Sequence, residues 1–283
     1  MIIDMHVHAF PEKVTSKAIE DLEARYGMKA FAGGTVNELT KHMAGSGVDL
    51  SVIQSVSTAA RQVPSINTWI SEILLDDSPV IGFGTVHPDF EGYRDEIQRM
   101  KELGIKGVKF QPCFQEFYPD EERMFPIYEE LIKAGISILF HMGDEILPAD
   151  TIYATPKRLA KVLDVMQRDM DNYNYRVQTD GNCAAPAKIV AAHLGGYRTW
   201  DQVEEYLIGR DLYLDASYVF GHIDFDRANR MIVSHGTDKV LFASDFPFAD
   251  QKKDLRAVSQ LKITQEEKEK ILGGNAARLL GLS

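Results

Sequence analysis

The sequence has very few cysteines and no long apolar run. Only Cys113 and Cys183 occur among 283 residues, and they form no Cys-x-x-Cys pair. This excludes a Cys-rich structural zinc site and leaves room for at most one disulfide. Two thiols in a chain of this length fit a reducing cytoplasm, where we expect the protein. Because no run reaches about 18 apolar residues, we expect no transmembrane helix.

Positive charge is also scarce. The 31 Lys and Arg residues face 42 Asp and Glu residues, so the formal net charge is -11. Nucleic acids and anionic membranes attract proteins through a positive field, and this balance argues against both partners. The expected partner is a small molecule, and a local basic pocket for an acidic substrate stays compatible with the composition. A hydrophobic content of 45% predicts a soluble globular protein with a sizeable core.

Short apolar segments alternate with amphipathic, helix-like stretches along the whole chain. Their nearly continuous apolar character is typical of parallel strands buried on both faces. Eight such units predict a single-domain (β/α)8 TIM barrel over residues 1–283, with an open doubly wound sheet as the rival architecture. No Gly-x-Gly-x-x-Gly follows a strand, which disfavours that rival. The predicted strands are 1–7, 49–56, 80–86, 105–110, 136–141, 188–193, 211–217 and 239–245.

Three βα connections are longer than a minimal barrel requires. They span residues 11–35, 142–187 and 246–263. Barrel enzymes keep their active sites on the side of these connections, at the carboxyl ends of the strands. We therefore expect all three to be lid or specificity elements.

Polar residues fall where the barrel hypothesis requires them, at the carboxyl ends of otherwise apolar strands. His6 and His8 share one face of the first strand because side chains alternate along a strand. Alone, a His-x-His pair is more often structural, and so is a lone histidine in the core. Together, however, these residues satisfy one another best around a divalent cation, since a buried polar group without a partner is costly. The set is His6, His8, His141, His193 and Asp245.

The chain resembles the amidohydrolase superfamily, in particular the amidohydrolase-2 branch that contains aminocarboxymuconate semialdehyde decarboxylase. The matching motifs are IDMHVH, GIKGVKF, FHMG, AHLGG, FASDFP and GGNAARLLGL, in order along the chain. The resemblance implies one divalent metal ion, Zn²⁺ first, with Mn²⁺ or Fe²⁺ as alternatives. The implied ligands are His6, His8, His141 and Asp245, with His193 beside the metal-bound water.

Two residues need comment, one within the predicted fourth strand and one directly after it. Lys109 matches a position that is a carboxylated, bridging lysine in binuclear relatives, although in this branch an unmodified substrate or structural contact is the expected role. Gln111 departs from the Lys-Leu-His-Pro form of the family, where this chain has Lys-Phe-Gln-Pro. This departure leaves the catalytic contribution of that position open.

The resemblance predicts a metal-dependent hydrolase. Asp245 would take a proton from a metal-activated water that attacks an amide, ester or lactone-like bond, and His193 would polarise the attacked carbonyl. Candidate residues for binding a substrate carboxylate or lining the mouth are Lys109, Arg61, Arg198 and His222.

Two other functions use the same residues. One is non-oxidative, metal-dependent decarboxylation of an unsaturated or aromatic acid, which also occurs in this branch. The other is metal or ligand binding without turnover, which the complete set of five residues disfavours. A homodimer is common among similar proteins and is the assembly to test.

Overall fold

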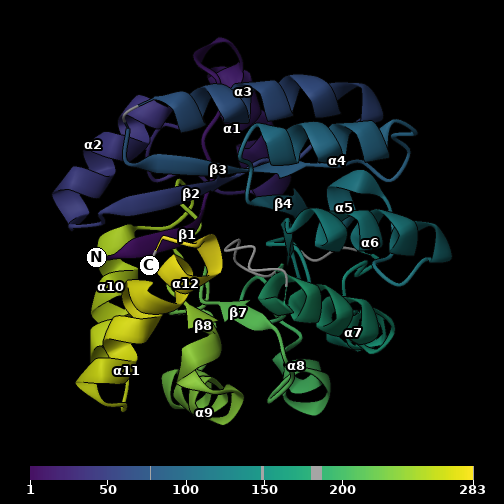
Figure 1. Cartoon of the computed structure of the whole chain (residues 1–283). Coiled ribbons are helices and arrows are strands. Elements are labelled where there is room, and N and C mark those ends of the chain that lie inside the picture. Colours follow the sequence, from purple (N-terminus) through teal and green to yellow (C-terminus); the bar gives the residue numbers. More distant parts are fainter. Residues whose placement is uncertain (77, 148–149, 180–186, 283) are drawn as a thin grey trace.

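Eight parallel strands form one closed barrel (Figure 1). The computed structural model describes residues 1–76, 78–147, 150–179 and 187–282, without the side chains of residues 168–179. Each strand pairs with its neighbour in chain order, and backbone hydrogen bonds from Met5 to Phe242 and from Asp245 to His6 close the barrel between β1 and β8. The strands are β1 Ile3–Val7, β2 Leu50–Gln54, β3 Val80–Thr85, β4 Gly107–Phe110, β5 Ser137–Phe140, β6 Ile189–Ala191, β7 Tyr213–Asp215 and β8 Val240–Leu241. The predicted TIM barrel is confirmed.

Helices surround the barrel and follow the strands in sequence. The α-helices are α1 Glu12–Tyr26, α2 Val36–Ser46, α3 Val63–Leu75, α4 Tyr93–Glu102, α5 Pro112–Gln115, α6 Phe125–Ala134, α7 Pro156–Thr179, α8 Trp200–Tyr206, α9 Phe225–His235, α10 Gln251–Gln260, α11 Gln265–Glu269 and α12 Asn275–Leu280. Short 3-10 turns occupy η1 Ala60–Gln62, η2 Glu122–Met124 and η3 Thr237–Lys239, and η4 Lys270–Gly274 is a π-helical turn.

The amphipathic, helix-like stretch over residues 120–135 is divided into η2 and α6. Pro126 has no backbone N–H to donate within a helix and is tolerated only in the first turn, which is where α6, beginning at Phe125, places it. The helix ends at Gly135, whose positive φ of 75° suits a residue without a Cβ. The strand β5 starts two residues later, as the sequence pattern predicts.

The amino-terminal end of the barrel is filled by apolar side chains. Inward-facing residues of the strands, among them Ile3, Met5 and Phe83, form one buried cluster with Ala276, Leu279 and Leu280 of α12. Figure 1 shows α12 and the chain's amino terminus together at this end. A separate, larger cluster joins the outer faces of the strands to the surrounding helices. The apolar plug leaves the opposite end of the barrel for polar groups.

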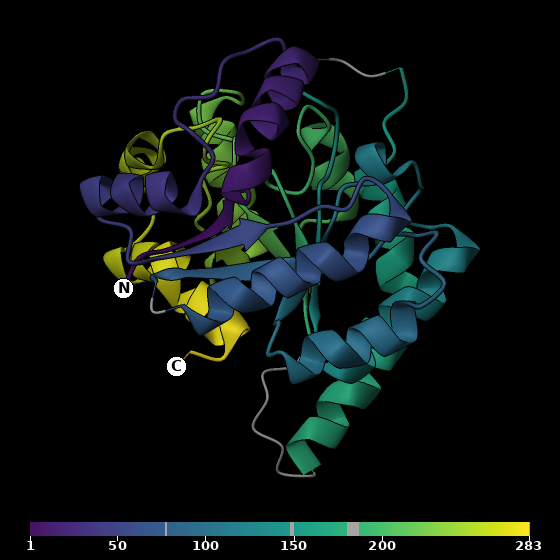
Figure 2. The same ribbon diagram turned by 90° about the horizontal axis from the view of Figure 1, so that it is seen from above.

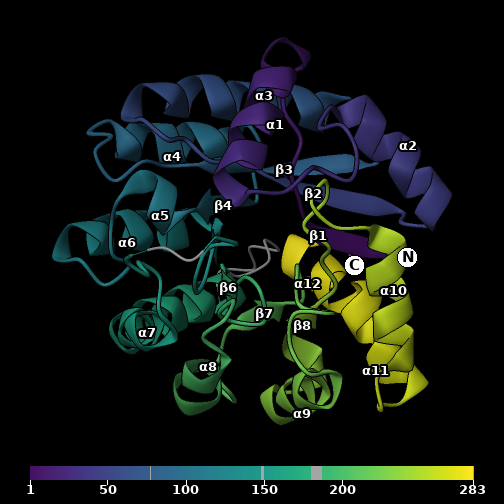
Figure 3. The ribbon, with the colours of Figure 1, turned by 180° about the vertical axis from the view of Figure 1, so that it is seen from behind.

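The predicted long connections lie on that opposite side. Figure 3 looks toward the carboxyl ends of the strands, and there α1, from the 11–35 connection, lies in front of the barrel. Seen from above in Figure 2, α1 lies far from α12. The 142–187 connection contains all of α7, but its residues 148–149 and 180–186, including Cys183, lie outside the described residues. None of the helices in the described part of the chain is long and apolar enough to cross a membrane.

Candidate metal centre and substrate cavity

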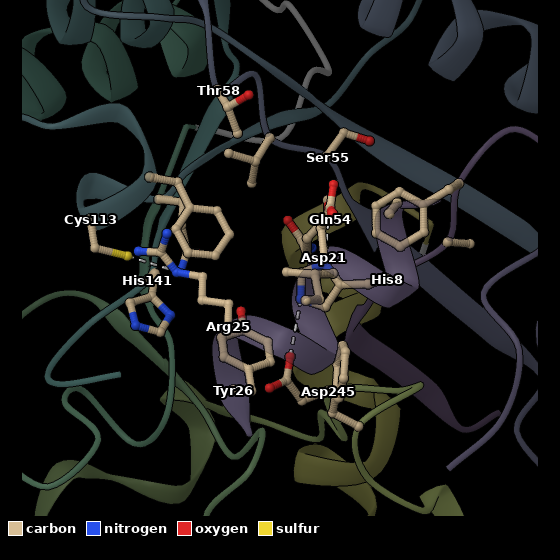
Figure 4. A pocket seen from close by; sticks show the side chains of 18 of the residues that line it. His8, Asp21, Arg25, Tyr26, Gln54, Ser55, Thr58, Cys113, His141 and Asp245 are labelled. Carbon is tan, nitrogen blue, oxygen red and sulfur yellow. Dashed lines mark hydrogen bonds and ion pairs between the residues drawn. The ribbon is translucent and has the colours of Figure 1, made fainter. Parts of the chain in front are cut away.

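A cavity of about 950 Å³ opens at the carboxyl ends of the strands. Its floor contains all five residues that the sequence places at strand ends, His6, His8, His141, His193 and Asp245. Much of its wall is apolar or aromatic, with side chains from α1, α3, α5 and the loops after β5 and β8 (Figure 4). The apolar lining residues include Val14, Leu22, Tyr26, Ile66, Trp69, Phe114, Ile146 and Phe248.

Three of the predicted metal ligands meet at one point. His6, His8 and Asp245 each offer a ligand atom, and these atoms lie within 4.8 Å of one another. Asp245 Oδ1 is 3.1 Å from His8 Nε2 and 3.5 Å from His6 Nε2. The two imidazoles project from one face of β1, and the closure of the barrel brings Asp245, beyond β8, beside them.

The outer nitrogen of each of these two imidazoles is fixed by an acceptor. His8 Nδ1 is 3.1 Å from the backbone oxygen of Gln54, and a carbonyl oxygen only accepts, so Nδ1 carries the proton. His6 Nδ1 is 2.9 Å from Asp215 Oδ2. In neutral rings this leaves both Nε2 lone pairs facing the Asp245 carboxylate, an arrangement that favours binding of a cation between them.

His193 and His141 form an adjoining pair. His193 Nδ1 is 3.0 Å from the backbone oxygen of Ser217 and donates its proton to it. In the neutral ring, Nε2 therefore carries a lone pair. That Nε2 lies 3.0 Å from His141 Nδ1. On the other side of the His141 ring, Nε2 is 3.2 Å from Glu145 Oε1, close enough for an ion pair although not aligned as a hydrogen bond. Cys113 donates its thiol hydrogen to the same carboxylate oxygen at 2.5 Å.

The Glu145 carboxylate faces one side of the His141 ring. Burial alone would raise the pKa of Glu145, but the neighbouring His141 and the Cys113 hydrogen bond lower it to about 2. An ionised carboxylate only accepts, so Glu145 would stabilise a proton on His141 Nε2, whereas the 3.0 Å contact with the His193 lone pair would stabilise one on Nδ1. His6, His8 and His193 thus direct a lone pair inward while an acceptor faces the outer nitrogen.

Electrostatics keep the centre in one protonation state. Burial lowers the pKa of His193 to about 4 and that of His6 well below its usual value, so both rings are neutral at neutral pH. Burial alone would raise the pKa of Asp245, but its contacts with His8 and His6 hold it far below the usual range. Neutral imidazoles and an ionised carboxylate are the forms that bind a divalent cation.

Backbone geometry also marks two of these residues. His193 and Asp245 have φ values of 60° and 79°, in the left-handed region that non-glycine residues rarely adopt. Each such residue costs about 1–3 kcal/mol and persists only where the surrounding structure holds it. Asp245 is held by its backbone N–H, which donates to the His6 carbonyl at 2.8 Å. The strain places both side chains over the cavity floor.

The donor set fits a divalent cation of the kind that nitrogen and oxygen ligands prefer. His6, His8 and Asp245 are already together, whereas His141 Nε2 belongs to a second set with Cys113 and Glu145. The role of His141 as a ligand of the same ion stays a prediction. Lys109 is fully buried below the set, with Nζ 3.1 Å from His6 Nε2, and burial lowers its pKa to about 8. Its carboxylation also stays a prediction.

The predicted substrate-binding residues lie around the cavity but not among its lining residues. Arg198 is 3.3 Å from the backbone oxygen of Glu145, and His222 stacks on Tyr218 with ring centroids 4.2 Å apart. Arg61 lies in the η1 turn, next to Gln62, which does line the cavity. Their roles in substrate binding stay predictions.

Several residues around the centre escaped the sequence interpretation. Asp215 ends β7 and interrupts an apolar strand, so its position contained the same signal as that of His141. Glu145 follows His141 by four residues in a loop, where no periodicity identifies it. Arg25 lines the cavity from α1, and nothing in its local sequence distinguishes it from the other charged residues of that helix.

The barrel and its polar floor define an enzyme architecture, and comparison with known proteins gives the family. The amidohydrolase family model matches residues 3–282. The chain therefore belongs to the amidohydrolase family, as the sequence motifs predict. No curated protein shows significant sequence similarity to it.

Similar solved structures cover nearly the whole chain. 5-Carboxyvanillate decarboxylase from Sphingomonas paucimobilis is 15% identical with a TM-score of 0.70, covering 99% of this chain and 98% of that one. The enzyme of the same name from Novosphingobium aromaticivorans, solved as a mutant with bound manganese, is 17% identical with a TM-score of 0.70, covering 99% and 97%. 2,6-Dihydroxybenzoate decarboxylase from Rhizobium is 16% identical with a TM-score of 0.62, covering 99% and 98%. At these identities the likeness establishes the fold.

Proposed function

We propose that the protein catalyses the non-oxidative, metal-dependent decarboxylation of a small aromatic or unsaturated carboxylic acid. The observation that carries the proposal is a cation-binding set of histidines and an aspartate on the floor of a cavity with largely apolar and aromatic walls. Such walls suit a planar hydrocarbon ring, while the floor suits its anionic group. The similar structures named as decarboxylases of aromatic acids support this reaction over hydrolysis, which the sequence interpretation ranks first.

His6, His8 and Asp245 would hold one divalent ion, and His141 is proposed as a further ligand through Nδ1. A divalent cation bound there would polarise the substrate's oxygens and stabilise negative charge that develops on them. Zn²⁺ is the ion that the family resemblance ranks first. The manganese in the Novosphingobium enzyme supports testing Mn²⁺ beside it.

Side chains of the protein would deliver one proton to the substrate. In the overall reaction the bond between the ring carbon and the carboxylate breaks, carbon dioxide leaves, and one proton takes its place on the carbon. Asp245 is the proposed carrier, because its carboxylate faces the cavity beside the cation-binding histidines, where it can pass a proton to the vacated carbon. His193, neutral and fixed through Ser217, would position a substrate oxygen beside it.

The test is a screen of aromatic and unsaturated acids with the Mn²⁺- and Zn²⁺-loaded protein in deuterium oxide. Decarboxylation releases carbon dioxide and leaves one deuterium on the vacated carbon, detected by mass spectrometry. Asp245→Asn should slow turnover by about a hundredfold or more, since a positioned acid–base group contributes about 10²–10⁴.

A parallel screen of amides, esters and lactones in ¹⁸O-labelled water tests hydrolysis. Incorporation of ¹⁸O into an acid product without release of carbon dioxide would establish the hydrolase and refute the proposed reaction. Tight metal binding without turnover in either screen would support the binding protein that the sequence interpretation disfavours.

A further inference from the structure

Positive charge reaches the cavity from one helix. Among the described lining residues, the only Lys and Arg side chains are Lys13, Lys17 and Arg25. All three lie on α1, at spacings of four and eight residues, and therefore on one face of that helix. Figure 3 shows α1 in front of the barrel, so this face looks across the cavity toward its floor.

Arg25 differs from the two lysines in what it contacts. Its guanidinium carbon lies 4.1 Å from the centre of the Phe114 ring, the geometry of a stacked cation–π pair. Phe114 belongs to α5, directly after β4, so the contact joins α1 to the barrel. Within the part of the chain that the structure describes, Arg25 has no ion pair or hydrogen bond, so its N–H donors stay available. Figure 4 shows its side chain reaching across the pocket, with the guanidinium end beside Cys113 and His141.

Lys17 provides the comparison on the same helix. Its ammonium group is 2.9 Å from both carboxylate oxygens of Asp21, and its side chain is 80% exposed. Its charge is thus balanced locally and directed to solvent. Arg25 forms no ion pair, although its charge helps to lower the pKa of the Glu145 carboxyl, and its plane is fixed by an aromatic ring. A free fork of N–H donors with a fixed plane suits bidentate recognition of a carboxylate.

We propose that Arg25 binds a second anionic group of the substrate, opposite the group held at the cavity floor. This inference rests on the proposed function and narrows its substrate to an aromatic acid with two anionic groups. The ring would lie between the aromatic and apolar walls, with one end at the His6, His8 and Asp245 set and the other at α1. Arg25 is thus a specificity-determining residue that the sequence pattern did not identify.

The loose attachment of α1 to the barrel is consistent with this role. Only Thr15 of this helix is buried, and Val14 is 49% exposed although it lines the cavity. A helix with so little buried surface gains stability from any ligand that bridges it to the barrel. Binding of a dianion through Arg25 would supply that bridge.

The experiment compares two probes that differ by one carboxylate, benzene-1,3-dicarboxylate and benzoate. Their dissociation constants for the Mn²⁺-loaded full chain are measured by isothermal titration calorimetry, which needs no turnover. A charge-assisted bidentate hydrogen bond contributes about 1.5–3 kcal/mol, so the dicarboxylate should bind about tenfold to a hundredfold more tightly.

Arg25→Gln should remove most of this preference while leaving benzoate affinity nearly unchanged. Arg25→Lys should restore part of it, because an ammonium group attracts the carboxylate without the bidentate geometry. Lys17→Gln is the matched control, since it removes the same charge from the same helix, and it should leave the preference intact.

Equal preference in the wild type and Arg25→Gln would overturn the inference. The inference would also be overturned if Arg61→Gln lost the preference while Arg25→Gln retained it. That result would assign the anion site to Arg61, which the sequence interpretation suggests. Failure of the decarboxylation screen with an intact Arg25-dependent preference would instead refute only the reaction. The two results are therefore distinguishable.

Discussion

His141 Nδ1 lies 3.0 Å from His193 Nε2, and the opposite nitrogen of the same His141 ring lies 3.2 Å from Glu145 Oε1. The imidazole is thus held between a neighbouring imidazole and a carboxylate that sequence reasoning did not identify. Because an ionised carboxylate stabilises a proton on the nitrogen that faces it, Glu145 favours the form of His141 whose Nδ1 can offer a lone pair to a cation.

Replacing this carboxylate should weaken metal binding. Glu145→Leu removes the acceptor that orients His141, and loss of such a supporting group typically costs about 10–100-fold in metal affinity. Competition with a chelating dye measures this change. Glu145→Gln keeps a carbonyl acceptor and should lose less, and Cys113→Ala keeps the carboxylate and should change little. Unchanged affinity in Glu145→Leu would show that His141 is not a ligand or needs no orientation.

Metal removal should destabilise the fold. Without a cation, the inward lone pairs of His6 and His8 face the Asp245 carboxylate, so binding of an ion to the native state stabilises it. At a free-ion concentration of about 100 times Kd the gain is about 2.7 kcal/mol. Thermal unfolding after chelation and after addition of Zn²⁺ or Mn²⁺ measures it. His8→Gln should lose most of the shift, and an equal shift in wild type and variant would place the ion elsewhere.

The fold was predictable because every strand is short, apolar and followed by a helical pattern. The position of the polar floor was predictable for the same reason, since a histidine that ends ISILFH can only lie at the carboxyl rim of a parallel barrel. The contacts that each residue makes within the rim were not predictable. Lys109 is fully buried beside His6, a contact between β4 and β1 that depends on the closure of the barrel.

Site residues in loops and on helix faces were also not predictable from the sequence. Gln54 orients His8 through its backbone oxygen, so its side-chain identity contains no signal for that role. Arg25 reaches the cavity only because α1 crosses the barrel mouth, and a helical pattern alone does not give the orientation of a helix. The preference for hydrolysis came from the family resemblance, because the same five residues serve either reaction.

The carboxyl-terminal helix should be essential for stability. Leu280 of α12 is 1% exposed and packs in the cluster that fills the amino-terminal end of the barrel. Leu280→Ala should lower the free energy of unfolding by about 2–5 kcal/mol, the usual cost of removing a buried leucine side chain. Leu282 is 49% exposed, and Leu282→Ala should change the free energy of unfolding by less than about 0.5 kcal/mol. Urea unfolding of both variants measures the two changes. Equal effects would show that α12 does not contribute to the apolar cluster as described.

Asp254 of α10 is a buried carboxyl group, and its Oδ2 has no hydrogen-bond partner among the described residues. Burial, followed by the charge of Asp4, raises its pKa to about 8 from the ordinary value of 3.8. Between these two values the folded state holds a proton that the unfolded state has released. Stability therefore falls as pH rises from about 4 to about 8, by at most about 1.4 kcal/mol per pH unit from this group.

Asp254→Asn should remove this dependence, because an amide stays neutral in both states. Urea unfolding of the wild type and the variant at pH 5 and pH 8 measures the difference, and the variant's gain in stability should be larger at pH 8. Glu91 is exposed, and Glu91→Gln is the control that removes a carboxyl group without changing the slope. A gain in Asp254→Asn that is equal at both pH values would show that the carboxyl is ionised in the folded protein throughout this range.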